Sequence, residues 1–187
     1  MKTQNAMKIC ALTLGVLMLS LSFANVASAN NDPKRQYIVG TGLICTISAS
    51  FCPDVASASN GDTVTIAGSG TFNPNPSMQA TGGGSFVHKS SVGVILGFGT
   101  WTALQLVSFT PGGFDTLGGV LPDGSEGGIA VIKVHVAPAT GGPGFTALLS
   151  IFCALNTPGV DEGINLNVIG VINFDTTVSG NTLFIKA

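Results

Sequence analysis

The chain has 187 residues, of which 45% are hydrophobic and only 9% are charged, and it contains 26 glycines. This length suits one domain of about 100–200 residues. The composition excludes a charged disordered tail, a coiled coil and a basic nucleic-acid binder.

The first 29 residues are typical of a secretory signal peptide. Two lysines precede an apolar run over Ile9–Phe23, and Ala27–Ala29 fits the small-x-small cleavage pattern. The run is short for a bilayer span of about 20 residues. We therefore predict a signal peptide over 1–29 and one secreted domain over 30–187, extracellular or periplasmic, with no membrane insertion of the mature chain.

The mature chain would carry five basic and nine acidic side chains, a formal charge of about −4. Such a surface offers no basic stripe for phosphate backbones and no polybasic patch for anionic lipid. Nucleic acid is therefore not expected as a partner, and the sequence leaves the oligomeric state open.

Period-two alternation and turn clusters predict about eight strands and almost no helix. In Gly128–Pro138, for example, alternate residues from Ala130 to Val136 are apolar, as in a half-buried strand. A short Ser/Ala-rich segment, Asp54–Asn60, is predicted as a single helical turn. The other predicted strands are Gln36–Ser48, Asp62–Phe72, Gln79–His88, Val92–Phe109, Phe145–Leu155, Gly163–Ile172 and Thr182–Lys186.

Three cysteines follow the signal segment: Cys45, Cys52 and Cys153. Export favours one disulfide and one leftover thiol. Cys153 alternates in phase with apolar residues of its strand, so its side chain is expected inside. We predict the pair Cys52–Cys153, with Cys45–Cys153 as the alternative and Cys45–Cys52 third; no Cys or His spacing indicates a metal site.

One short pattern, Gly-x-Gly-hydroxyl-aromatic, occurs three times, over 68–72, 82–86 and 97–101. Glycines two apart lie on the same face of a strand, so each copy presents bare backbone next to an aromatic side chain. Such patches permit sharp coiling of a strand or let a neighbouring aromatic cover the backbone. A phosphate-binding loop is disfavoured because no helix is predicted after any copy.

The segment Val92–Phe109 is long for one strand, whose usual length is about 5–6 residues, so we expect it to bend. Long bent strands suit a closed barrel in which one strand contributes to two sides. The predicted fold is a single small antiparallel β-barrel of about eight strands, with a β-sandwich as the alternative.

Several segments also carry a resemblance: Cys52–Ala56, Asn60–Asp62, Gly68–Phe72, Glu162–Ile164 and Gly180–Phe184. Through these segments, which are spread over nearly the whole mature chain, the protein resembles an uncharacterised family of small secreted Gly-rich β-proteins. The resemblance implies one exported domain and brings no activity, cofactor or site residue with it.

Titratable residues that could support catalysis are few. His88 and His135 are the only histidines, and they would form an acid–base pair if both entered one lumen. His135 shares a strand face with Lys133, however, which favours an outer position. No G-x-S-x-G or HExxH motif is present.

The predicted connection between Phe109 and Gly128 is long and holds three carboxylates, Asp115, Asp123 and Glu126. A connection of this length and charge suits a lid, a binding loop or a cation site with oxygen ligands, as well as simple solvation. Solvation is favoured because the spacing is not that of a calcium loop.

Three functions fit these features. The favoured one is binding of an apolar or amphipathic small molecule inside a β-barrel, without a cofactor. The alternatives are a structural or surface-interaction protein, indicated by low charge and abundant Gly, Ser and Thr, and a cofactor-free cyclase or isomerase with a barrel active site. The sequence favours binding over catalysis.

Overall fold

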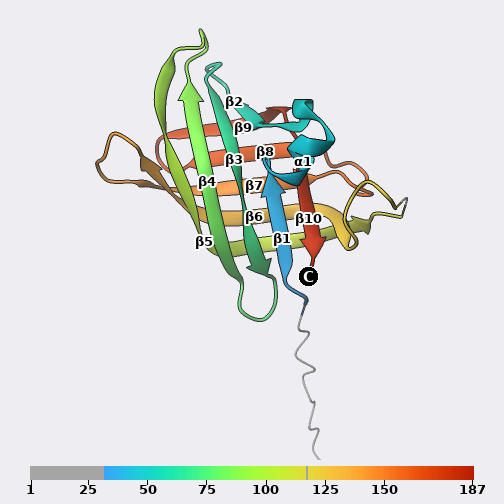
Figure 1. Ribbon diagram of the computed structural model, residues 1–187. Coiled ribbons are helices and arrows are strands. Elements are labelled where there is room, and N and C mark those ends of the chain that lie inside the picture. Colours follow the sequence, from blue (N-terminus) through green and yellow to red (C-terminus); the bar gives the residue numbers. More distant parts are fainter. Residues whose placement is uncertain (1–31, 117) are drawn as a thin grey trace, which may run out of the picture.

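The computed structural model describes residues 32–116 and 118–187, so the predicted signal peptide lies outside the described residues. The described chain is all-β, as predicted (Figure 1). Its elements, in chain order, are β1 (Arg35–Val39), α1 (Leu43–Ile47), the 3-10 helix η1 (Ala49–Phe51), β2 (Asp54–Ala58), β3 (Thr63–Asn73), β4 (Gln79–Lys89), β5 (Ile95–Phe114), β6 (Ser125–Pro138), β7 (Phe145–Cys153), β8 (Gly163–Val168), β9 (Ile172–Ser179) and β10 (Thr182–Lys186).

All ten strands belong to one antiparallel sheet that closes on itself. Hydrogen bonds run from β2 through β3, β4, β5, β6, β7, β8 and β9 and back to β2, which makes a ring of eight strands. The remaining two strands, β1 and β10, pair with each other and connect β3 to β6. Figure 1 shows β3 and β4 crossing in front of β7 and β8 at a steep angle, so both a flattened barrel and a sandwich describe the ring.

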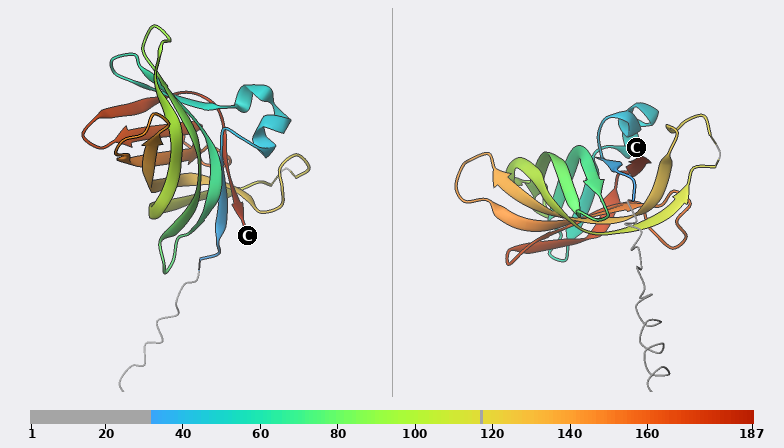
Figure 2. Two further views of the ribbon diagram at one scale, coloured as in Figure 1. Left: turned by 60° about the vertical axis from the view of Figure 1, so that its left-hand side comes forward. Right: turned by 90° about the horizontal axis from the view of Figure 1, so that it is seen from below.

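The predicted strand Gln36–Ser48 was wrong beyond Val39. Gly40 and Gly42 adopt positive φ angles of 51° and 60°, which turn the chain out of β1 and into α1. Figure 2 shows α1 lying outside the ring. The residues that follow the turn therefore form a short helix outside the ring rather than extend the strand, and Ile44 is the buried residue of that helix.

Two strands of the ring were not predicted. The segment expected to form a helical turn, Asp54–Asn60, forms β2, whose side chains alternate between buried and half-buried. Strand β9 was missed because Phe174 is its only buried residue, so its sequence lacks an apolar alternation.

Strand β5 is long and irregular, as the prediction of a bent strand requires. It pairs with β4 through its first half and with β6 from Gly99 to its end at Phe114, and the register with β6 shifts between Ala103 and Gln105 and again between Leu106 and Ser108. Because β5 continues to Phe114 and β6 starts at Ser125, the connection between them is much shorter than predicted.

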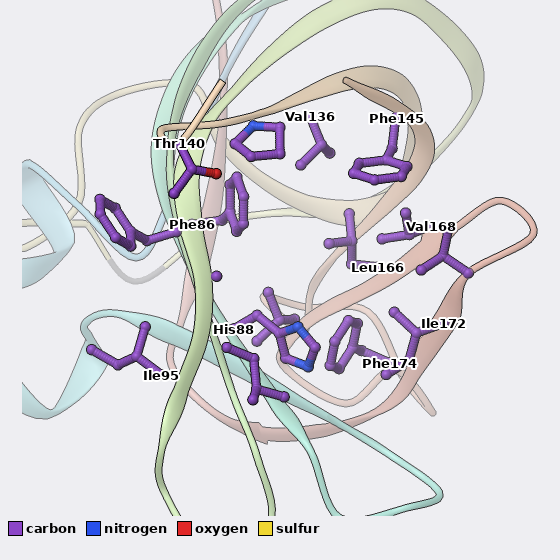
Figure 3. A pocket seen from close by; sticks show the side chains of 16 residues that line it. Phe86, His88, Ile95, Val136, Thr140, Phe145, Leu166, Val168, Ile172 and Phe174 are labelled. Carbon is purple, nitrogen blue, oxygen red and sulfur yellow. The ribbon is translucent and has the colours of Figure 1, made fainter. Parts of the chain in front are cut away.

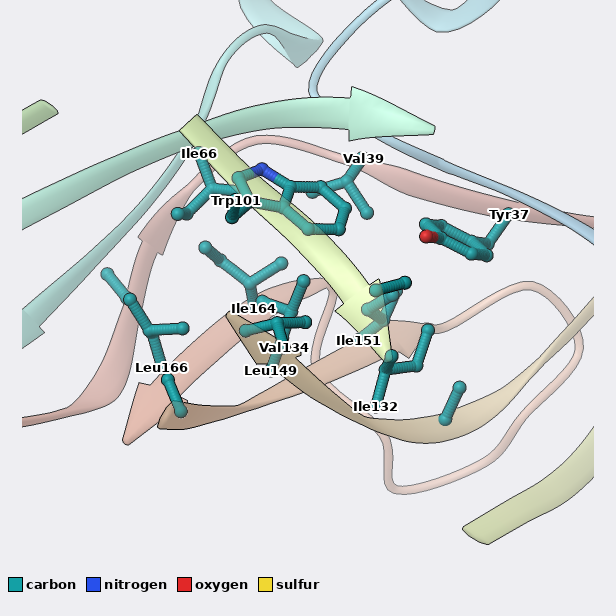
Figure 4. Packing of buried hydrophobic residues seen from close by; sticks show 14 of the residues in the cluster. Tyr37, Val39, Ile66, Trp101, Ile132, Val134, Leu149, Ile151, Ile164 and Leu166 are labelled. Atoms are coloured by element: carbon teal, nitrogen blue, oxygen red, sulfur yellow. The ribbon is translucent and has the colours of Figure 1, made fainter. Parts of the chain in front are cut away.

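The interior of the ring is filled by apolar side chains from the inner face of the sheet, contributed by strands on opposite walls of the ring. Figure 4 shows Trp101 and Ile66 facing Val134, Leu149 and Ile164. The glycine pattern provides the space for the largest ring, since a β-carbon at Gly68 would lie 2.5 Å from the Trp101 indole. This confirms that the glycines let an aromatic cover the backbone.

The predicted disulfides Cys52–Cys153 and Cys45–Cys153 were both wrong. Cys45 and Cys52 are bonded to each other, with their Cα atoms 5.5 Å apart, because α1 and η1 fold the short segment between them back on itself. Cys153 is a free, buried thiol on the inner face of β7, as its alternation predicted. The error was to require a partner inside the ring.

Candidate functional site

An open cavity lies at one end of the ring, where β4 ends, β5 begins and the β6–β7 and β8–β9 turns meet. Its volume is about 430 Å³, within the range of about 300–1,000 Å³ that is usual for small-molecule sites. Figure 3 shows the lining side chains, which come from the seven strands β3 to β9 and from two of the turns between them. Most are apolar, including Phe86, Phe145, Leu166, Val168 and Phe174.

The rim of the cavity exposes apolar side chains to solvent. Leu96 and Phe98 at the start of β5 are 56% and 51% exposed, and Val171 in the β8–β9 turn is 61% exposed. The deeper wall is buried, with Val64 and Leu166 almost fully covered. An apolar molecule would therefore find hydrophobic contacts from the mouth to the floor.

His88 is the one titratable side chain that lines this cavity. It lies on the inner face of β4, and the edge of Phe174 meets its ring at 5.2 Å between centroids. Its Nε2 is 3.1 Å from a carboxylate oxygen of Asp62. Asp62 also accepts a hydrogen bond of 3.1 Å from the backbone N–H of Ser91, so two strand connections hold the carboxylate beside the ring.

The electrostatics of this pair favour an ionised Asp62. Partial desolvation works to raise the pKa of the carboxyl group, but hydrogen bonds from His88, Asn60 and Ser91 outweigh it and hold the pKa below its usual range. A carboxylate can only accept, so it binds the Nε2–H of the imidazole. Such a carboxylate fixes the tautomer and the orientation of the ring.

The structure does not bring the two predicted histidines together. His135 lies on β6, which is separated from β4 by β5, and its side chain is exposed on the outer face of the sheet. The partner of His88 is instead Asp62. In the sequence, Asp62 was identified only as the first residue of a predicted strand. Its pairing with His88 depends on the register of β3 against β4.

Of the three carboxylates in the β5–β6 region, Glu126 and Asp123 lie in different surroundings, and the backbone N–H of Asp115 donates a hydrogen bond to the carbonyl oxygen of Ser125. Glu126 is buried at the start of β6 and forms an ion pair with Arg35 of β1. Asp123 is exposed in the connection. Nowhere in the described part of the chain do three His, Cys, Asp or Glu side chains gather in a way that could hold a metal ion.

A second polar cluster lies at the far end of β2 from the cavity, with Asp54 and Thr182 buried and Glu162 half-buried. Glu162 accepts hydrogen bonds from the backbone N–H of Ala154 at 2.7 Å and of Thr182 at 2.6 Å. Asp54 is fully buried, and neither of its carboxyl oxygens has a hydrogen-bond partner in the described chain. Burial, together with the charge of Glu162, raises the pKa of Asp54 to about 8.

Within residues 32–116 and 118–187, no helix could span a bilayer. Comparisons of the chain with protein families, with curated protein sequences and with solved structures gave no match. The resemblance to small secreted Gly-rich proteins therefore stays a prediction, and the fold alone does not determine a function.

Proposed function

We propose that the protein binds an apolar or amphipathic small molecule in the cavity at the end of the ring. The observation that carries this proposal is the shape and lining of the cavity: about 430 Å³, open to solvent, with apolar walls and one imidazole. A cavity with mostly hydrophobic walls and few polar groups is the usual form of a small-molecule site.

The exposed rim supports the same proposal. Apolar side chains that lie in solvent at the mouth gain contacts when a ligand covers them. Export of the protein is also part of the proposal, supported by the Cys45–Cys52 disulfide, since disulfides persist in oxidising compartments.

Gly97 gives a direct test of binding. It lines the cavity, and a β-carbon there would meet no heavy atom within 4 Å, so Gly97→Leu would place its side chain in the open space. We expect the fluorescent apolar probe N-phenylnaphthylamine to bind the protein, and Gly97→Leu to weaken its affinity by about tenfold or more through the lost volume.

The matched control is Thr100→Leu, which adds the same side chain at an exposed position of the same strand. This variant should keep the affinity for the probe. If the protein does not bind the probe, or if both variants bind it as the natural chain does, the cavity is not a ligand site.

The His88–Asp62 pair favours a second candidate function, a cofactor-free isomerase or cyclase. A carboxylate-oriented imidazole in an apolar cavity is suited to move a proton on a bound substrate. This candidate differs from simple binding in one measurable result: a molecule recovered from the protein would be chemically changed during incubation, and His88→Phe would abolish the change.

A further inference from the structure

The polar chemistry of the cavity is concentrated on one side chain. Apart from His88, Thr140 is the only residue with a polar side chain among those that line it, and the lining includes no lysine or arginine. A ligand with a polar group must therefore satisfy that group on the imidazole, on Thr140 or in solvent at the mouth.

The hydrogen bond to Asp62 determines what the imidazole can offer. Because the Nε2–H group donates a hydrogen bond to the carboxylate, this tautomer of the imidazole has its lone pair on Nδ1. No group of the described chain hydrogen-bonds this nitrogen. Nδ1 of His88 is thus available to accept a hydrogen bond from a donor group on the ligand.

Charge narrows the class of ligand further. The Asp62 carboxylate lies 3.1 Å from the ring, and the nearest residue in sequence with a positive charge, Lys89, is exposed on the opposite face of β4. An anionic head group at His88 would approach one negative charge without a fixed cation to offset it. A neutral head group avoids this cost.

We infer that the cavity selects a neutral amphipathic alcohol, whose chain or ring system fills the apolar space while its hydroxyl group donates a hydrogen bond to Nδ1 of His88. This inference rests on the proposed function and adds to it the class of ligand. Fatty alcohols, phenols and hydroxylated polycyclic compounds share this chemistry.

The test compares two isomers of equal size, of which only one carries a hydrogen-bond donor. Decanol and methyl nonyl ether are each titrated against the mature protein loaded with N-phenylnaphthylamine, and the loss of probe fluorescence is followed. One hydrogen bond within a cavity is worth about a fivefold difference in affinity. We expect decanol to displace the probe at about one-fifth of the ether concentration.

Two variants assign the effect to one residue. His88→Phe keeps an apolar ring but no acceptor, so the ratio between the alcohol and the ether should fall to about one. Thr140→Val removes the other polar side chain of the lining and should leave the ratio unchanged. Near-ultraviolet circular dichroism confirms that each variant is folded.

Two results overturn the inference while leaving the proposed function standing: equal displacement by alcohol and ether from the natural chain, or stronger displacement by decanoate than by decanol. The first would show that no donor is recognised, and the second that the imidazole receives an anion. Both comparisons use the natural chain, so they hold even if a variant fails to fold. Failure of the probe to bind at all would instead remove the proposed function.

Discussion

The indole of Trp101 lies directly against the backbone of Gly68, so that a β-carbon at Gly68 would come within 2.5 Å of the ring atom Cζ2. The same β-carbon would also meet the carbonyl oxygen of Gly83, again at 2.5 Å. Trp101 is almost fully buried and stacks on Tyr37 at 6.3 Å between centroids. The only tryptophan of the chain can therefore occupy its buried site only because residue 68 has no side chain.

Replacing Gly68 by alanine should therefore destabilise the fold. A methyl group there must displace either the indole or the backbone of β4, and overpacking of this kind costs about 1–3 kcal/mol. Urea unfolding followed by Trp101 fluorescence measures the loss. We also expect a shift in the emission maximum of the native state, because the indole is pushed from its site.

Gly97→Ala is the matched control for Gly68→Ala. Gly97 belongs to the same repeated pattern, but its β-carbon would meet open space and its backbone is not in the left-handed region. This substitution should change the free energy of unfolding by less than about 0.5 kcal/mol. Equal losses at the two positions would contradict the packing argument.

Sequence patterns predicted the parts of the fold that depend on alternation. The inner face of β6 and the buried position of Cys153 follow from the order of apolar residues along each strand, whereas the irregularity of β5 follows from its length. Strands β2 and β9 escaped prediction because their sequences show little apolar alternation. They pair with each other, and β2 also pairs with β3 and β9 with β8.

The candidate site was predictable only in part. His88 was identified because histidines are rare in this chain, but its partner Asp62 is brought near by the register between β3 and β4 and by the loop that precedes β3. The buried state of Glu126 depends on Arg35, which is 91 residues away in sequence. Such long-range pairs leave no local pattern, since each residue alone resembles a solvated charge.

Asp54 should make the stability of the protein depend on pH. Its pKa is about 8 in the folded state and close to 4 in an unfolded chain. Between these values the folded state binds more protons than the unfolded state, so the free energy of unfolding falls as pH rises from about 4 to about 8, by up to about 5 kcal/mol. Urea unfolding at a series of pH values measures this slope.

Asp54→Asn removes the titrating group and should flatten most of the slope, with a gain in stability at pH 8. A smaller slope of the same sign should remain, because burial also raises the pKa of Glu162. Asp123→Asn, at an exposed position, should leave the profile unchanged. A profile that stays equally steep in Asp54→Asn would show that other groups cause it.

The free cysteine should be Cys153 and should be unreactive in the native protein. Burial is the main cause that raises the pKa of this thiol to about 12, so very little thiolate forms at neutral pH. Alkylation of the mature chain in denaturant without reductant, followed by peptide mapping, should label Cys153 alone. Label on Cys45 or Cys52 would contradict the observed disulfide.

The Cys45–Cys52 disulfide closes a short loop, with a sequence separation of 7 residues. On the chain-entropy argument, a loop of this size is worth about 2–3 kcal/mol. Cys45→Ser and Cys52→Ser should each lose this amount in urea unfolding. The double variant should lose no more than either single variant, because the bond is already absent in each.

The ion pair between Arg35 and Glu126 should be costly to break from one side only. Both side chains are buried, and the Arg35 guanidinium also lies 4.6 Å from the centroid of the Phe109 ring. Removing one partner of a buried pair leaves the other charge without compensation, at a cost of about 3–5 kcal/mol. We expect this loss in both Arg35→Met and Glu126→Leu, measured by urea unfolding.

The double variant distinguishes this effect from simple loss of packing. Arg35→Met combined with Glu126→Leu removes both charges, so its loss should be well below the sum of the two single losses. Additive losses would show that the two side chains contribute through packing alone.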